Sequence, residues 1–250
     1  FTCFLMGSLI IGAPAINQQT FGQPWILYAL FLSLLFVIFF NVGAFAIQKI
    51  GLIIISIFQK LSLVFPVIVG ILFFGETGHF LKLLAIVIAL AAIVLLNLPD
   101  KKLESSTQII RRYWYLTFLV LLGNGTIELT LFYVQERAIV MNTGLDFVSA
   151  LFGFAGILGL IFMVISKAGL FNKTDIIAGI CLGIPNFFTI YLLIKALEIG
   201  WDGSVLFPVN NVGTLAFTAL VGLFLFKEKL SRYNYWGLFL AILSVVLISY

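Results

Sequence analysis

The chain has 250 residues, of which 62% are hydrophobic and 10% charged, with a formal net charge of +4 and a mean hydropathy of +1.20. A soluble domain carries roughly 25% charged residues, so folding in water would leave this chain with a largely apolar surface. The composition excludes a soluble globular protein and predicts an all-α integral membrane protein. The basic residues stand in short clusters between apolar runs, so they indicate membrane topology and no binding of nucleic acid.

Nine apolar segments are interpreted as membrane-spanning helices, since such a helix needs about 20 mostly apolar residues. In chain order, the segments are 1–16, 25–47, 52–74, 80–98, 113–135, 146–166, 176–197, 204–226 and 233–250. Short breaks with turn chemistry separate most of them. The stretch at 97–112 is the one long polar interruption, and it divides the sequence into two halves.

The two halves repeat at a constant offset of 152 residues, which places Glu76 on Glu228. Glycines coincide at the same offset. The coincident pairs are Gly7 with Gly159, Gly51 with Gly203, and Gly70 with Gly222. We therefore expect a first repeat at 1–98, a linker at 99–112 and a second repeat at 113–250.

The repeat also predicts a helix before the start of this chain. The second repeat begins its first helix near Tyr113, and the counterpart of that helix would precede Phe1. The expected fold is two inverted repeats of five transmembrane helices, with the first helix missing and nine present, because an odd number of helices reverses the second repeat. Inverted repeats are common in transporters, whose sites lie near the bilayer midplane.

Two related segments carry a family resemblance. FPVIVGILFFGE at Phe65–Glu76 and TALVGLFLFKE at Thr218–Glu228 resemble the fourth helices of EamA-type transporters in the drug/metabolite transporter superfamily. The preceding segments, AFAIQKIG at Ala44–Gly51 and ALEIGWDG at Ala196–Gly203, also fit. The resemblance covers essentially the whole chain, and it implies ten helices in two inverted repeats and transport of metabolites, amino acids, nucleotide-linked sugars or drugs.

Glu128 is the first candidate for a functional side chain, because ionisable residues inside membrane spans are rare and commonly functional. It stands about fifteen residues into its helix, near mid-bilayer at 1.5 Å per residue. Thr117, Asn124 and Gln135 share its helical stripe, so Glu128 should face protein or a cavity. A carboxyl group there can hold a proton or a substrate group. The alternative is a structural glutamate bonded to a neighbouring helix.

Lys60 is the second candidate, about eight residues into the segment 52–74. Ser56 and Gln59 lie on the same helical face. Lys60 either lines the site or extends to the membrane interface, as long side chains do. If Lys60 meets Glu128, their titrations are coupled.

The counterpart of Gln59 in the second half is Asn211, which shares a helical stripe with Thr214 and Thr218. Polar residues at related positions of two helices favour a shared cavity lining. We therefore include Gln59, Asn211, Asn124 and Thr214 with Glu128 and Lys60 as substrate or coupling residues.

Gly183 and Pro185 stand near the middle of the segment 176–197. Proline removes a backbone donor, and membrane helices tolerate this where neighbours or water satisfy the carbonyl that is left. We interpret the pair as a candidate hinge, and a static kink is the alternative.

The four tryptophans fall at predicted helix ends. They are Trp25, Trp114, Trp201 and Trp236. Tryptophan is enriched at membrane–water interfaces, so we expect all four to be interface anchors.

The sequence contains no motif for catalysis or for cofactor binding, such as a phosphate-binding glycine loop, a zinc-ligand spacing or a Gly-x-Ser-x-Gly elbow. Cys3 and Cys181 lie in apolar runs and suggest neither a disulfide nor a metal site. We expect no enzyme, no metal and no cofactor.

The expected function is secondary transport of a small organic metabolite or drug by alternating access, coupled to protons or to an exchanged substrate. The expected partners are that small molecule and the lipid bilayer. The expected location is a cell membrane, with the bacterial inner membrane favoured. The alternative is a non-transporting membrane scaffold or assembly subunit. The sequence leaves the substrate and the oligomeric state open.

Overall fold

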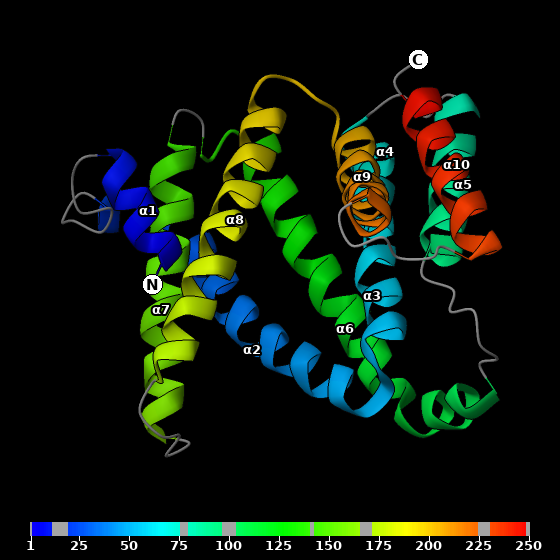
Figure 1. Cartoon of the computed structure of the whole chain (residues 1–250). Helices are drawn as coiled ribbons and strands as arrows, with labels where there is room; N and C mark the ends of the chain where they lie inside the picture. Colours follow the sequence, from blue (N-terminus) through cyan, green and yellow to red (C-terminus); the bar gives the residue numbers. More distant parts are fainter. Residues whose placement is uncertain are drawn as a thin grey trace. The chain divides into compact units, whose positions relative to one another are not determined.

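The computed structural model describes residues 2–11, 20–75, 80–96, 104–140, 143–165, 172–224 and 231–248, and these ranges are largely helical (Figure 1). The helices are α1 Thr2–Ile11, α2 Ile26–Ile50, α3 Leu52–Leu61, α4 Val64–Phe73, α5 Phe80–Leu96, α6 Glu104–Glu136, α7 Gly144–Ile165, α8 Lys173–Glu198, α9 Gly203–Phe224 and α10 Arg232–Ile248, with a 3-10 helix, η1, at Thr20–Gly22. Within the described ranges, six spans are long and apolar enough to cross a membrane and three shorter helices are also apolar. The described parts of all nine predicted segments are therefore helical, and the chain is a multi-pass membrane protein.

The predicted segment 52–74 contains two helices, α3 and α4, with a turn at Ser62 and Leu63 between them. Pro66 accounts for the break. In a continuous helix the residue at 66 would donate its N–H to the carbonyl of Ser62, and proline has no N–H to donate. The Ser62 carbonyl accepts instead from the N–H of Phe65, at 3.0 Å. The chain thus tightens at Ser62, close to the middle of the span.

Within the predicted linker at 99–112, residues 104–112 are helical and form the first part of α6. Tyr113, with φ −116° and ψ 24°, lies at a kink that separates this part from the membrane-spanning part of α6. The rest of the predicted linker, and both repeat glutamates, Glu76 and Glu228, lie outside the described residues.

The chain forms two compact units, each of which takes one segment from each half of the sequence. Unit 1 consists of Phe1–Ile38 and Thr130–Gly200, and unit 2 consists of Phe39–Leu129 and Trp201–Tyr250. At the predicted offset of 152 residues, the boundary after Ile38 would correspond to one after residue 190, ten residues from the observed boundary after Gly200. The two predicted repeats are therefore not two separate compact units.

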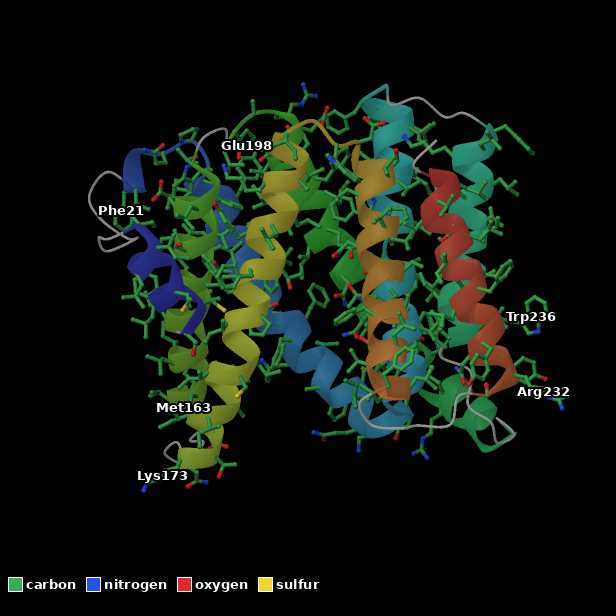
Figure 2. The ribbon with its side chains drawn as sticks, turned by 45° about the horizontal axis from the view of Figure 1, so that its top comes forward. Phe21, Met163, Lys173, Glu198, Arg232 and Trp236 are labelled. Atoms are coloured by element: carbon green, nitrogen blue, oxygen red, sulfur yellow. The ribbon has the colours of Figure 1, made fainter. Side chains whose placement is uncertain are left out.

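In unit 1, α1 packs closely against α7 and α8 where small residues meet, as is usual between membrane helices. A Cβ atom at Gly7 would collide with the side chain of Ser149, and one at Gly183 would lie 2.7 Å from Cβ of Thr2. The thiol of Cys3 donates to the carbonyl oxygen of Gly183 at 3.0 Å. Helices α7 and α8 are antiparallel, since Met163, near the end of α7, and Lys173 lie at the same end of the pair (Figure 2).

Three of the four tryptophans are exposed, as expected of interface anchors, and Trp236 projects outward from α10 in Figure 2. The exposed ones are Trp114, Trp201 and Trp236. The prediction for Trp25 was wrong, because this side chain is only 1% exposed. It packs edge to face against Phe147, with ring centroids 5.8 Å apart. The indole therefore fastens the start of α2 to α7 inside unit 1.

In unit 2, α5 and α10 lie side by side (Figure 1). At the predicted offset of 152 residues, the described residues of α5 map onto those of α10. The two helices are antiparallel, because the side chain of Asn234, near the start of α10, donates to the carbonyl oxygens of Leu95 and Leu96 at 3.3 and 2.6 Å. These carbonyls lie at the end of α5, so α10 caps them.

Small buried residues occupy corresponding positions on α5 and α10, and we call the contact between these helices the α5–α10 seam. The matching pairs are Ala85 and Gly237, Ala89 and Ala241, and Ala92 and Ser244. Small residues allow two helix backbones to approach, which is a main source of helix association in lipid. The approach is closest at Gly237, where a Cβ atom would lie 2.7 Å from the backbone nitrogen of Leu96.

Gly237→Ala should therefore destabilise the protein, by about 1–3 kcal/mol, since overpacking against a helix backbone has this typical effect. Thermal unfolding of the purified protein in detergent measures the change. Gly213→Ala is the matched control, because a Cβ atom at Gly213 has no neighbour within 4 Å. Equal unfolding temperatures for the two variants would show that the seam is looser than described.

Candidate functional site

The candidate site lies in unit 2, where a buried apolar cluster joins the end of α2 and the start of α3 to α6. The cluster consists of Ala46, Ile50, Ile54, Ile55, Leu116 and Val120. Gly51 joins α2 to α3 with φ +106°, a backbone conformation that glycine adopts most readily. This packing aligns α3 with α6, so that polar side chains further along both helices can meet.

A second contact brings α4 onto α6. A Cβ atom at Gly125 would lie within 2.8 Å of ring atoms of Phe65, so the ring rests directly on the helix backbone. Phe65 follows the turn at Ser62 by three residues, and Gly125 precedes Glu128 by three residues. The close contact therefore places the α3–α4 turn beside Glu128.

Four polar side chains from α6, α9, α3 and the α3–α4 turn form one hydrogen-bonded group, the Glu128 cluster, which consists of Lys60, Ser62, Glu128 and Asn211. The amide nitrogen of Asn211 donates to Oε1 of Glu128 at 3.1 Å. The ammonium group of Lys60 donates to Oδ1 of Asn211 at 3.1 Å. The hydroxyl oxygen of Ser62 lies 3.0 Å from Oε2 of Glu128. Both carboxyl oxygens are thus bonded to protein.

The Glu128 cluster places a cation and a carboxyl group in apolar surroundings. Ser62 and Asn211 are buried, at 0% and 2% exposed, and Lys60 and Glu128 are half-buried. Among the described side chains, Lys60 and Glu128 form no direct ion pair, and the Asn211 amide lies between them. An amide can fill this position because it accepts at its oxygen and donates at its nitrogen.

The structure joins three of the six predicted substrate or coupling residues, Lys60, Glu128 and Asn211. Asn124 donates to the carbonyl of Val120 in its own helix, at 2.9 Å. The Gln59 side chain lies next to Gly43 on α2. Thr214 is exposed and bonds back to Asn210 on its own helix. These three do not join the cluster through a described hydrogen bond.

The candidate hinge residues, Gly183 and Pro185, belong to unit 1. Helix α8 runs through both from Lys173 to Glu198. Gly183 has a packing role, since its missing side chain leaves room for Thr2 of α1. A hinge motion at this position stays a prediction.

Ser62 is the cluster member that the sequence analysis did not single out. On a straight helix, Ser62 would follow Lys60 by two residues and point away from it, whereas it would follow Gln59 by three residues and lie on the same side of the helix. The signal was Pro66, because a proline four residues after a serine predicts a broken backbone hydrogen bond at that serine.

The arrangement suits proton exchange and the binding of a polar ligand, because one carboxyl group is held by neutral donors with a cation nearby. In the described part of the chain, no group of three His, Cys, Asp or Glu side chains could hold a metal ion.

Comparison with known proteins yields one distant similarity. No protein-family model matches the chain. Over 220 residues, the chain is 26% identical to an uncharacterized protein of Haemophilus influenzae, and the aligned region covers 88% of the chain and 74% of that protein. The similarity thus extends over most of both chains.

Proposed function

We propose that this protein is a secondary transporter, which moves a small organic metabolite or drug across a membrane by alternating access. The observation that carries the proposal is the position of Glu128 within a membrane-spanning helix, hydrogen-bonded to α9 and to the turn between α3 and α4. Ionisable groups are costly in such a position and commonly mark substrate or ion paths.

Glu128 is the residue that exchanges a proton or binds a substrate group. With Glu128 ionised, its negative charge balances the positive charge of Lys60 through Asn211. With Glu128 protonated, the cluster carries a net positive charge and can attract an anionic group of a ligand. A cationic group could instead take the place of the proton.

The duplicated architecture supports the same proposal. Helices α5 and α10 have small buried residues at positions that correspond at the offset of 152 residues, and each compact unit combines parts of both halves. Two inverted repeats would supply the moving parts of alternating access. The resemblance to EamA-type transporters agrees with this reading, and we propose the bacterial inner membrane as the location.

Glu128→Gln tests the proposal in the full-length protein. Glutamine can keep both hydrogen bonds, because its oxygen accepts from Asn211 and its nitrogen donates to Ser62. We therefore expect a folded variant that has lost proton-coupled flux in proteoliposomes. Glu198→Gln is the matched control, since Glu198 pairs with Lys195 at the end of α8 and should leave flux unchanged.

A ligand screen by thermal shift identifies the substrate class with the same two variants. A ligand at 100 times its dissociation constant stabilises a protein by about 2.7 kcal/mol. We expect one chemical class to stabilise the wild type and the Glu198→Gln control and not Glu128→Gln. If Glu128→Gln transports like the wild type, Glu128 is structural. If neither the wild type nor Glu128→Gln transports any compound, and no member of a broad library shifts the unfolding temperature of either, the protein is a scaffold or assembly subunit.

A further inference from the structure

The hydroxyl group of Ser62 has two potential hydrogen-bond acceptors and a single proton. Its oxygen lies 2.6 Å from the carbonyl oxygen of Gln59 and 3.0 Å from Oε2 of Glu128. A carbonyl oxygen can only accept, whereas a carboxyl oxygen accepts when ionised and can donate when protonated. The direction of the two bonds therefore depends on whether Glu128 carries a proton.

Two arrangements satisfy these contacts. When Oε2 of Glu128 carries the proton, it donates to Ser62, and Ser62 donates to the carbonyl of Gln59. When Glu128 is ionised, the hydroxyl group turns to the carboxylate, since a charged acceptor forms the stronger hydrogen bond. The Gln59 carbonyl then loses this donor. Oε1 accepts from Asn211 in both arrangements.

The Gln59 carbonyl depends on Ser62 because the helix ends there. In a continuous helix, this carbonyl would accept from the N–H of Leu63, but that N–H donates to the carbonyl of Lys60, at 3.4 Å. The carbonyl of Ser62 also lacks the donor that it would have in a continuous helix, because Pro66 has no backbone N–H. An unpaired backbone carbonyl in apolar surroundings is destabilising.

We propose that Ser62 transmits the proton occupancy of Glu128 to the α3–α4 turn. When Glu128 releases its proton to water, the Ser62 hydroxyl leaves the Gln59 carbonyl and the turn rearranges to find that carbonyl another donor. Lys60 on α3 is the charged group that faces the carboxyl group, α9 contributes the neutral Asn211, and α4 and α9 contain no charged residue. The inference rests on the proposed function, whose coupling residue is Glu128.

Hydrogen–deuterium exchange of the full-length protein in nanodiscs tests the proposal, with peptides that cover Gln59–Phe65. The exchange rates are corrected for the intrinsic pH dependence of amide exchange, and peptides from α5 and α10 serve as the internal reference. In the wild type, corrected exchange at the turn should rise with pH. Glu128→Gln should lose this response, because its amide always donates to Ser62, as the protonated acid does.

Ser62→Ala should also lose the response, and Ser62→Cys should reduce it, since a thiol is a weaker donor. Ser56→Ala, on α3, is the matched control and should respond like the wild type. A pH response that persists in Ser62→Ala would overturn the proposal. If Ser62→Ala does not fold, Ser62→Cys decides the matter, because a pH response as large as that of the wild type would also overturn the proposal. The absence of any pH response in the wild type would overturn it as well.

Flux measurements separate this inference from the proposed function. If Glu128→Gln loses flux while exchange at the turn never responds to pH, transport by way of Glu128 stands and the role of Ser62 is excluded. If exchange responds as expected while Glu128→Gln transports like the wild type, Ser62 senses Glu128 and the transport role of Glu128 is excluded.

Discussion

Asn211→Leu should destabilise the protein by about 3 kcal/mol or more, because it removes two hydrogen bonds to ionisable groups, and a hydrogen bond to a charged group contributes about 1.5–3 kcal/mol. Leucine has a similar size and no polar group, so the ammonium group of Lys60 and Oε1 of Glu128 would both lose a hydrogen bond within apolar surroundings. Equilibrium unfolding in detergent measures the change, and we expect flux to be lost with it.

Asn210→Leu is the matched control for this prediction. It makes the same chemical change one residue earlier, at a half-buried position on α9 that has no described side-chain hydrogen bond. Its effect should be about 1 kcal/mol or less, as for an average substitution. Similar losses for the two variants would mean that Asn211 does not hold the charged pair together.

The double variant that exchanges the charges of Lys60 and Glu128 should be much less destabilised than either variant with a single charge reversal. Lys60→Glu places two carboxyl groups on Asn211, and Glu128→Lys places two ammonium groups there. The double variant restores one of each. The Asn211 amide can then turn by 180° about its last side-chain bond, donating to residue 60 and accepting from residue 128.

A double-mutant cycle on thermal unfolding and on flux measures the coupling between Lys60 and Glu128. Residues in one hydrogen-bond network typically show coupling energies of about 0.5–3 kcal/mol. We expect the double variant to unfold closer to the wild type than either single variant does. A double variant no better than the single ones would show that the two residues are not paired through Asn211.

Much of the fold follows from the sequence, because a lipid environment demands long apolar helices and leaves few alternatives. Within the described residues, all nine apolar segments are helical. The same logic found Glu128, Lys60 and Asn211, since polar groups in an apolar span must meet partners. The grouping into compact units did not follow, because it depends on contacts between distant segments.

The differences between the expected and observed polar contacts have a common physical origin. Helical periodicity places residues on faces of a straight helix, and it cannot show whether a polar side chain bonds to another helix or to its own backbone. Asn124 and Thr214 do the latter. Ser62 was missed because it does not lie on the helical face that Ser56 and Lys60 share. Trp25 was misplaced because an apolar ring at a helix end can pack inward as well as against lipid.

The capping of α5 by α10 has a consequence for biosynthesis. Asn234 follows Leu96, whose carbonyl it caps, by 138 residues. Proteins fold from the N-terminus as they are made, so the ribosome completes most of the second half before α5 can acquire this partner. During that time, α5 lies in the bilayer with its small residues against lipid. Closure of the seam is thus among the last steps of assembly, and a nascent chain that stops before α10 leaves unit 2 open at that side.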